Sequence, residues 1–177
     1  APLARAADWP MWGGSPSRNM VSTGKNLPEP EAISAGKFLP KSETIDPKST
    51  KHVRWVSKLG SQAYGSPVVA GGRVFVGTNN EAPRDPKQTG DRGVLMCFDE
   101  KTGELKWQLV VPRLEIDRAK VSEDFDDMNL GICSTATVEG NRVYIVSNRC
   151  EVICLDLHGQ ANGNDGPFQD ESTFSVP

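Results

Sequence analysis

One stretch of this 177-residue chain occurs twice, and this repetition restricts the fold more than any other feature. The segment Val69–Asn79 reads VAGGRVFVGTN, and residues 138–148 read VEGNRVYIVSN, a constant separation of 69 residues. A second pair of segments, Met96–Asp99 and Ile153–Asp156, is separated by 57 residues, and the difference of 12 residues indicates an insertion in the first copy, which we assign to the region of Glu81–Asp91. Repeats of this period are typical of arrays in which similar units bury their faces against one another.

Short runs of β-branched and aromatic residues, separated by glycine-containing turns, predict antiparallel strands in both copies. In the first unit we expect four strands in sequence order, over Ser66–Ala70, Arg73–Thr78, Val94–Asp99 and Glu104–Val111, preceded by a further β-like run at Val53–Val56. In the second unit we expect three strands, over Ser134–Val138, Arg142–Ser147 and Glu151–Leu157, with no evident fourth.

The second strand of each unit is apolar on both faces. Val74–Val76 and Val143–Val146 show no alternation between apolar and polar residues, so both faces of each sheet are expected to be covered. Four-stranded sheets stacked face to face around an axis meet this condition. The sequence therefore predicts an all-β fold of the β-propeller type, of which this chain supplies about two blades.

The segment Cys97–Trp107, CFDEKTGELKW, carries a resemblance to a known family. It resembles the blade motif A-x-D-x-x-T-G-x-x-x-W of the PQQ-like (pyrroloquinoline-quinone repeat) β-propellers, with Cys97 where that family usually has Ala. Residues 66–77 resemble the first two strands of the same repeat, and DWPMWG at residues 8–13 resembles the segment that opens many exported bacterial members. The resemblance is good over residues 52–111 and weaker over 131–157, where no Thr-Gly and no Trp follow Asp156.

Each residue type of the motif has a physical role in this reading. Asp99 accepts N–H bonds in the turn, and Thr102 and Gly103 close it, with Gly103 suited to a positive φ angle. Trp107 offers a large flat surface for docking against the neighbouring blade, and Trp55 does the same for the blade before Gly65.

The expected organisation runs from an irregular N-terminal part to a glycine-rich C-terminal part. It comprises a signal-peptide remnant or tail (1–7), an irregular segment (8–51), the first blade with a preceding outer strand (52–111), a long loop (112–130), the second blade (131–157) and a Gly/Asn-rich loop (158–177). Because two blades cannot close a ring, we expect an N-terminal fragment of a larger propeller that is not a stable monomer by itself.

The chain ends and the charge distribution bear on location and partners. Small residues at Ala4 and Ala6 resemble the end of a secretory signal, which favours a periplasmic or extracellular location, with a frayed tail as the alternative. The net charge is −3, and the Lys and Arg residues are scattered along the chain. This distribution argues against nucleic-acid binding, which requires clustered basic residues. No apolar run is long enough for a transmembrane segment.

Four cysteines are present, without a CxxC pair. Cys97 and Cys154 occupy equivalent positions and are expected to be small core residues. Cys133 and Cys150 flank a predicted hairpin, so they either form a disulfide or both remain thiols.

The acidic and amide residues after the last strand form a candidate calcium site. Their oxygen atoms are hard ligands at close spacing, and the candidate ligands are Asp156, Asn162, Asn164, Asp165 and Glu171. The alternative is a polar turn-rich loop in which Asn and Asp bond their own backbone.

No catalytic residue is assigned from the sequence, and whether the chain is an enzyme stays open. The favoured function is an exported, non-catalytic binding or assembly scaffold, whose lengthened connections at 81–91 and 112–130 contact other proteins of a complex. Its partners would include the remaining blades of the propeller, from the same chain or a separate one. The alternatives are a quinoprotein dehydrogenase that uses PQQ and calcium, which the family resemblance implies, and a subunit of a periplasmic redox complex.

Overall fold

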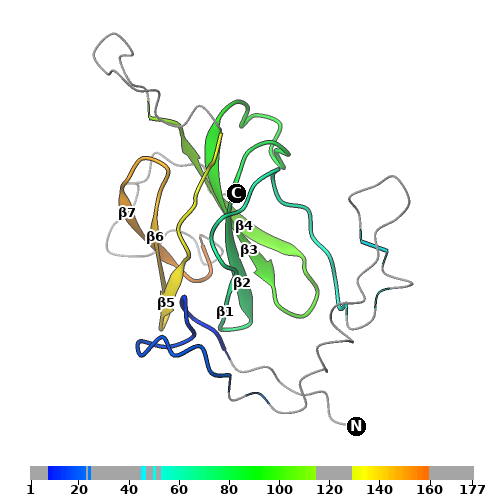
Figure 1. Cartoon of the computed structure of the whole chain (residues 1–177). Coiled ribbons are helices and arrows are strands. Elements are labelled where there is room, and N and C mark those ends of the chain that lie inside the picture. The colour runs from blue at the N-terminus through cyan, green and yellow to red at the C-terminus, as the bar shows by residue number, and fades with distance from the viewer. Residues whose placement is uncertain are drawn as a thin grey trace.

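The computed structural model describes residues 8–22, 24, 45–46, 50, 53–114 and 129–159, and all regular structure within them is β (Figure 1). Seven strands form two antiparallel sheets. Within this part of the chain there is no helix long and apolar enough to cross a membrane.

Sheet 1 has four strands in sequence order and sheet 2 has three. Sheet 1 consists of β1 (Val68–Ala70), β2 (Arg73–Asn79), β3 (Arg92–Asp99) and β4 (Leu105–Pro112). Sheet 2 consists of β5 (Thr137–Glu139), β6 (Arg142–Val146) and β7 (Val152–Asp156). All seven strands lie within segments that the sequence predicted as strands, apart from one or two residues at their ends.

The two sheets share one register, as the repeat requires. Val74 pairs with Phe98 between β2 and β3, and Val143 pairs with Leu155 between β6 and β7. These pairs correspond through the 69- and 57-residue separations of the repeat. The insertion in the first copy therefore lies entirely in the β2–β3 connection and leaves the strand pairing unchanged.

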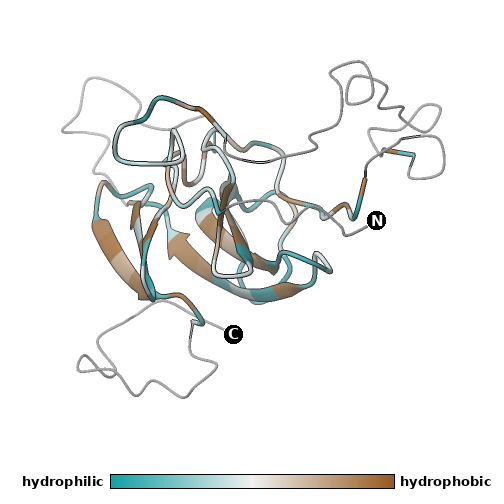
Figure 2. Cartoon of the chain, turned by 90° about the horizontal axis from the view of Figure 1, so that it is seen from below, coloured by the Kyte–Doolittle hydropathy of each residue, from teal (hydrophilic) through white to brown (hydrophobic). Residues whose placement is uncertain are grey.

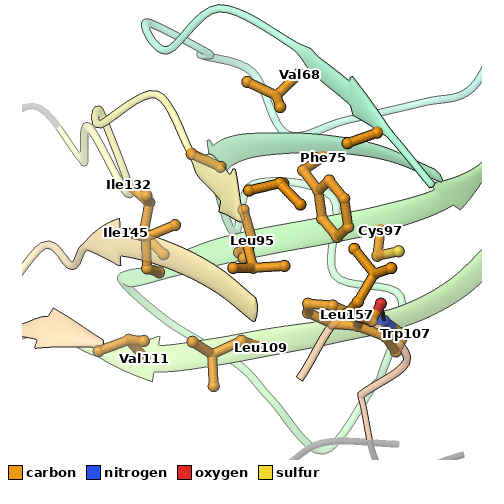
Figure 3. Packing of buried hydrophobic residues seen from close by; sticks show 14 residues of the cluster. Val68, Phe75, Leu95, Cys97, Trp107, Leu109, Val111, Ile132, Ile145 and Leu157 are labelled. Atoms are coloured by element: carbon orange, nitrogen blue, oxygen red, sulfur yellow. Dashed lines mark hydrogen bonds between the residues drawn. The ribbon is translucent and has the colours of Figure 1, made fainter. Parts of the chain in front are cut away.

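The main core lies between the two sheets (Figure 3). Phe75, Leu95 and Leu109 of sheet 1 are fully buried against Val143 and Ile145 of sheet 2. The opposite face of sheet 1 carries a second buried cluster, built on Val76, Met96 and Phe98, and residues of the preceding segment cover it. Sheet 1 is thus covered on both faces, as its apolar strands predicted. In Figure 2 the strands are brown along most of their length, whereas the connections are mainly teal and white.

Sheet 2 differs from the prediction, because the described part of the chain covers only one of its faces. Val143 and Ile145 point into the core, but Val146 is 44% exposed and Val152 of the adjacent strand is 78% exposed. The expectation that both faces of Val143–Val146 are covered is therefore not met in this structure.

The segment at Val53–Val56 also differs from the prediction, since it forms no strand. Its side chains do alternate: Val53 and Trp55 are partly buried, whereas Arg54 and Val56 are exposed. The alternation comes from lying along the apolar face of sheet 1, where Trp55 packs against Phe98. A strand assignment also needs a hydrogen-bonded neighbour, which this segment does not have among the described residues.

A short N-terminal segment joins the inner edges of both sheets. Trp9 forms an antiparallel bridge with Val69 of β1, with N–O distances of 2.6 and 3.0 Å. The carbonyl of Pro10 accepts a hydrogen bond from the N–H of Val138 in β5 at 2.7 Å. Asp8 Oδ2 accepts one from the N–H of Gly71 at 3.2 Å. Residues 8–10 therefore occupy a sheet edge that would otherwise present unpaired backbone groups.

Candidate functional site

The antiparallel topology places four connecting segments, including the two longest, at one end of the sheets. The β2–β3 connection (80–91), the chain around β4–β5 (113–114 and 129–136) and the β6–β7 turn (147–151) all leave this end, as does the approach to β1 (60–67). We call it the loop end. The short turns that connect β1–β2, β3–β4 and β5–β6 lie at the opposite end, the turn end (Figure 1).

A buried asparagine organises the loop end. Asn79, the last residue of β2, is 1% exposed. Its Nδ2 donates to the carbonyl of Asn129 at 2.8 Å and to Ser61 Oγ at 2.9 Å, and its Oδ1 accepts from the N–H of Ser61 at 2.9 Å. One side chain therefore links the segment before β1 to the segment before β5. A buried polar group with its partners satisfied gives a defined conformation to the segments it joins.

The residue before Asn79 extends this network. Thr78 is fully buried, and its Oγ1 donates to the carbonyl of Gln62 at 2.7 Å while it accepts from the N–H of Gly60 at 3.0 Å. The carbonyl of Thr78 accepts from the N–H of Ile132 at 3.2 Å. Together Thr78 and Asn79 fix residues 60–62 and 129–132 against the end of β2.

The insertion in the first repeat is folded onto itself and onto sheet 1. Asn80 Nδ2 donates to the carbonyls of Gln88 and Gly90 at 2.7 and 3.1 Å. Arg84 Nη2 donates to the carbonyl of Lys58 at 2.6 Å, and the Arg84 guanidinium lies 5.6 Å from the centre of the Phe98 ring. The insertion is thus an ordered loop with its own polar contacts.

The exposed side chains of the loop end, among the described residues, include one aromatic ring and several charged groups. Tyr64 is 63% exposed, and its hydroxyl donates to Gln62 Oε1 at 2.9 Å. Glu81, Arg84 and Lys87 of the insertion are exposed as well and carry charges of both signs. Tyrosine and arginine are enriched among the residues that dominate protein interfaces.

The motif residues meet at the turn end, away from this surface. Asp99 Oδ1 accepts hydrogen bonds from the N–H of Lys101 at 2.9 Å and from the N–H and hydroxyl of Thr102 at 3.0 and 3.1 Å. Gly103 has φ of 72° and packs against the Trp55 ring, so a side chain at that position would collide with it.

Two tryptophans make the same contact with successive sheets. Trp55 Nε1 donates to the carbonyl of Glu100 at 2.9 Å. Trp107, which is 3% exposed, donates from Nε1 to the carbonyl of Leu157 at 3.1 Å, and Figure 3 shows the two residues side by side. Glu100 and Leu157 each follow the aspartate of their own repeat. Each tryptophan therefore donates a hydrogen bond to the turn end of the next sheet.

The sequence did not single out Thr78, Asn79 and Asn80. The signal was present in the repeat itself, because Thr78-Asn79 at the end of one strand returns as Ser147-Asn148 at the end of its counterpart. Because a pair of polar residues stands at the end of the same apolar strand in both copies, the two pairs are expected to organise the loops that follow.

The four cysteines form no disulfide within the part of the chain that the structure describes, which includes all four. Cys133 Sγ contacts the carbonyls of Leu130 and Gly131, and Cys150 is exposed with φ of 60°. Cys97 is buried as expected, and burial raises the pKa of its thiol to about 12. Cys154, which was also expected to be a core residue, is exposed.

Most of the candidate calcium ligands lie outside the described residues, namely Asn162, Asn164, Asp165 and Glu171. Asp156 is described, and its Oδ1 accepts the N–H of His158 at 2.7 Å. Among the residues that the structure describes, no three His, Cys, Asp or Glu side chains are grouped so that they could hold a metal ion. Residues 1–7, with the expected signal remnant, also lie outside.

Stacked antiparallel sheets, joined at one end by repeated tryptophan clamps, define an all-β repeat protein built from propeller blades. Residues 45–122 match the family model described as outer membrane protein assembly factor BamB, a model of PQQ-like repeats. This part of the chain is therefore similar to the PQQ-like repeat family. A comparison with curated proteins finds no match.

Proposed function

We propose that the chain is an exported, non-catalytic β-propeller scaffold that contacts other proteins through its loop end, within a larger ring or complex. The observation that carries this proposal is the buried network at Thr78 and Asn79, which holds two connections of the loop end in a fixed shape. Loops that are ordered before binding lose less conformational entropy when a partner docks.

The residues on these ordered loops support the same proposal. Tyr64 is exposed two residues after Gln62, which is fixed by Thr78, so its aromatic ring is presented from a defined backbone. The charged insertion leaves the sheets at the same end. The matched family description names an assembly factor of the outer membrane, which favours an exported location and protein partners over a small-molecule substrate.

The experiment places a photo-crosslinking amino acid at Tyr64 or Lys87 in cells that make the protein. Lys101, exposed in the β3–β4 turn, is the matched control at the opposite end. Discrete protein adducts from positions 64 and 87, and none from 101, are expected. Equal adducts from all three positions, or none from the loop end, would contradict the proposal.

The alternative, a quinoprotein dehydrogenase, is tested with the same purified protein. PQQ is added together with Ca²⁺, and bound quinone absorbance and dye reduction are measured. The scaffold proposal expects neither signal. Stoichiometric PQQ binding with dye reduction would replace it with the enzyme.

A further inference from the structure

Positive charge exceeds negative charge on and around the insertion, although the whole chain has a net charge of −3. The insertion, together with the described charged residues bonded to it or next to it, contains five cations and three acids. The cations are Lys58, Arg84, Lys87, Arg92 and Arg113, and the acids are Glu81, Asp85 and Asp91. This part of the loop end therefore differs in sign from the molecule as a whole.

The three acids are engaged by donors of the chain itself. Glu81 Oε1 accepts a hydrogen bond from a side-chain amide in the segment before β5. Asp85 Oδ1 accepts the backbone N–H of Lys87 at 2.9 Å. Asp91 Oδ2 forms an ion pair with Arg113 Nη1 at 3.1 Å. Each carboxylate is thus directed toward a group of the fold rather than toward the cations that surround it.

The exposed cations lack such partners. Lys58, Arg84 and Lys87 are all exposed, and the described part of the chain supplies none of them with a carboxylate partner. We call these three side chains the basic surface. Their charges remain available to a second molecule, because no acid of the described chain neutralises them by direct contact.

Two contacts hold the basic surface in a defined arrangement. Arg84 Nη2 donates to the carbonyl of Lys58 at 2.6 Å and to Ser57 Oγ at 3.1 Å, which ties the insertion to the segment that covers sheet 1. Lys87 lies in a turn that is closed by a hydrogen bond of 3.0 Å from the N–H of Gln88 to the carbonyl of Asp85. Cations on a fixed backbone lose less conformational entropy when a partner docks.

We infer that the basic surface binds a carboxylate-rich segment of a protein partner, an inference that rests on the proposed function and names the chemistry of its partner. Complementary charges increase the association rate and select among partners. A membrane surface fits less well, because segments that bind membranes also bury an apolar face. The insertion, which the structure describes throughout, exposes no large apolar side chain.

The test measures binding of a fluorescent decaglutamate peptide to the purified full chain by anisotropy. In about 20 mM NaCl we expect saturable binding, which weakens as salt screens the charges. Lys58→Gln together with Lys87→Gln is expected to raise the Kd by about three- to tenfold, the effect of losing two exposed ion pairs. Near-UV circular dichroism shows whether the variant keeps the fold.

Lys101→Gln together with Lys106→Gln is the matched control, because it removes the same charge from the turn end. The Kd of this control is expected to stay unchanged. Equal weakening in both double variants would mean that only net charge matters, and it would overturn the inference. Absence of decaglutamate binding would overturn it as well. So would lysine-dependent binding to vesicles of phosphatidylglycerol and phosphatidylcholine in place of the peptide.

Photo-crosslinking from Tyr64 separates this inference from the loop-end contact itself. With Lys58→Gln and Lys87→Gln in the same chain, the yield of adducts from position 64 is expected to fall. An unchanged yield would overturn the acidic partner and leave the loop-end contact standing. Lysine-dependent decaglutamate binding without any Tyr64 adducts would support the basic surface and contradict the loop-end contact alone.

Discussion

Asp99 shows how a single side chain fixes a turn between two strands. Its Oδ1 atom accepts three hydrogen bonds from Lys101 and Thr102. The N–H of Thr102 is the main reason why the pKa of this carboxyl lies below its ordinary value. Because the folded pKa is lowered, the ionised form stabilises the fold above the unfolded pKa, and this contribution is lost as the pH falls through the folded value.

Asp99→Asn is expected to reduce this dependence on pH. The variant keeps a side-chain oxygen acceptor but no carboxylate, so its stability should fall less than that of the natural chain between about pH 5 and pH 2. The measurement is the midpoint of urea unfolding, followed by tryptophan fluorescence, at several pH values. Glu104→Gln, which removes an exposed carboxylate from the end of the same turn, is the control. An unchanged pH profile in Asp99→Asn would contradict the expected role.

The sequence predicts Asp99 and fails to predict Asn79 for a physical reason. All partners of Asp99 Oδ1 lie within three residues, so the motif contains the whole turn. Asn79 bonds to Ser61 and Asn129, which are distant along the chain. Only the folded sheets bring these segments together, and no local pattern encodes that contact.

At the level of elements, the repeat made the strands predictable. Each strand of one copy supports the assignment of its counterpart, and the register followed from the same separations. The segment Val53–Val56 has no counterpart in the second repeat, so its assignment as a strand could not be checked in the same way. Its alternating pattern of buried and exposed side chains reflects packing on sheet 1 rather than strand pairing. The exposed face of sheet 2 was not predicted. An apolar strand indicates that both of its faces need to be buried, but it does not identify the segment that packs against each face.

The clamp from β4 to sheet 2 is expected to depend on the indole N–H of Trp107. Trp107→Phe keeps most of the apolar surface but leaves the carbonyl of Leu157 without its donor, at a cost of about 1–3 kcal/mol. Trp107→Ala also removes buried surface and should cost about 3–5 kcal/mol. Urea titrations followed by alkylation of Cys97 give both values. Trp12→Phe, at a half-exposed indole, is the matched control, and a Trp107→Phe effect no larger than that of Trp12→Phe would exclude the clamp.

The whole molecule combines one well-covered sheet with one that is half covered. Sheet 1 has buried clusters on both faces, whereas sheet 2 presents Val146 and Val152 to water. Sheets 1 and 2 share one core between them. The exposed face of sheet 2 and the unpaired edges of the outer strands lower the stability of the two-sheet structure and favour association with other molecules.

The purified 177-residue chain is therefore not expected to melt as a highly stable two-state monomer. Calorimetry should give a broad transition in which the van't Hoff and calorimetric enthalpies disagree, because the two sheets differ in cover. A sharp transition above about 65 °C with equal enthalpies, and a monomeric mass throughout, would show that the chain is complete as a folding unit.

The N-terminal bridge has a consequence for the order in which the chain folds. Asp8 reaches Gly71 across 63 residues, and Pro10 reaches β5 across an even longer span. Contacts of such high sequence separation form late, because the intervening chain loses entropy when the loop is closed. Asp8 and Trp9 can therefore dock only after β1 is in place, and the contact from Pro10 cannot form until β5 has been made.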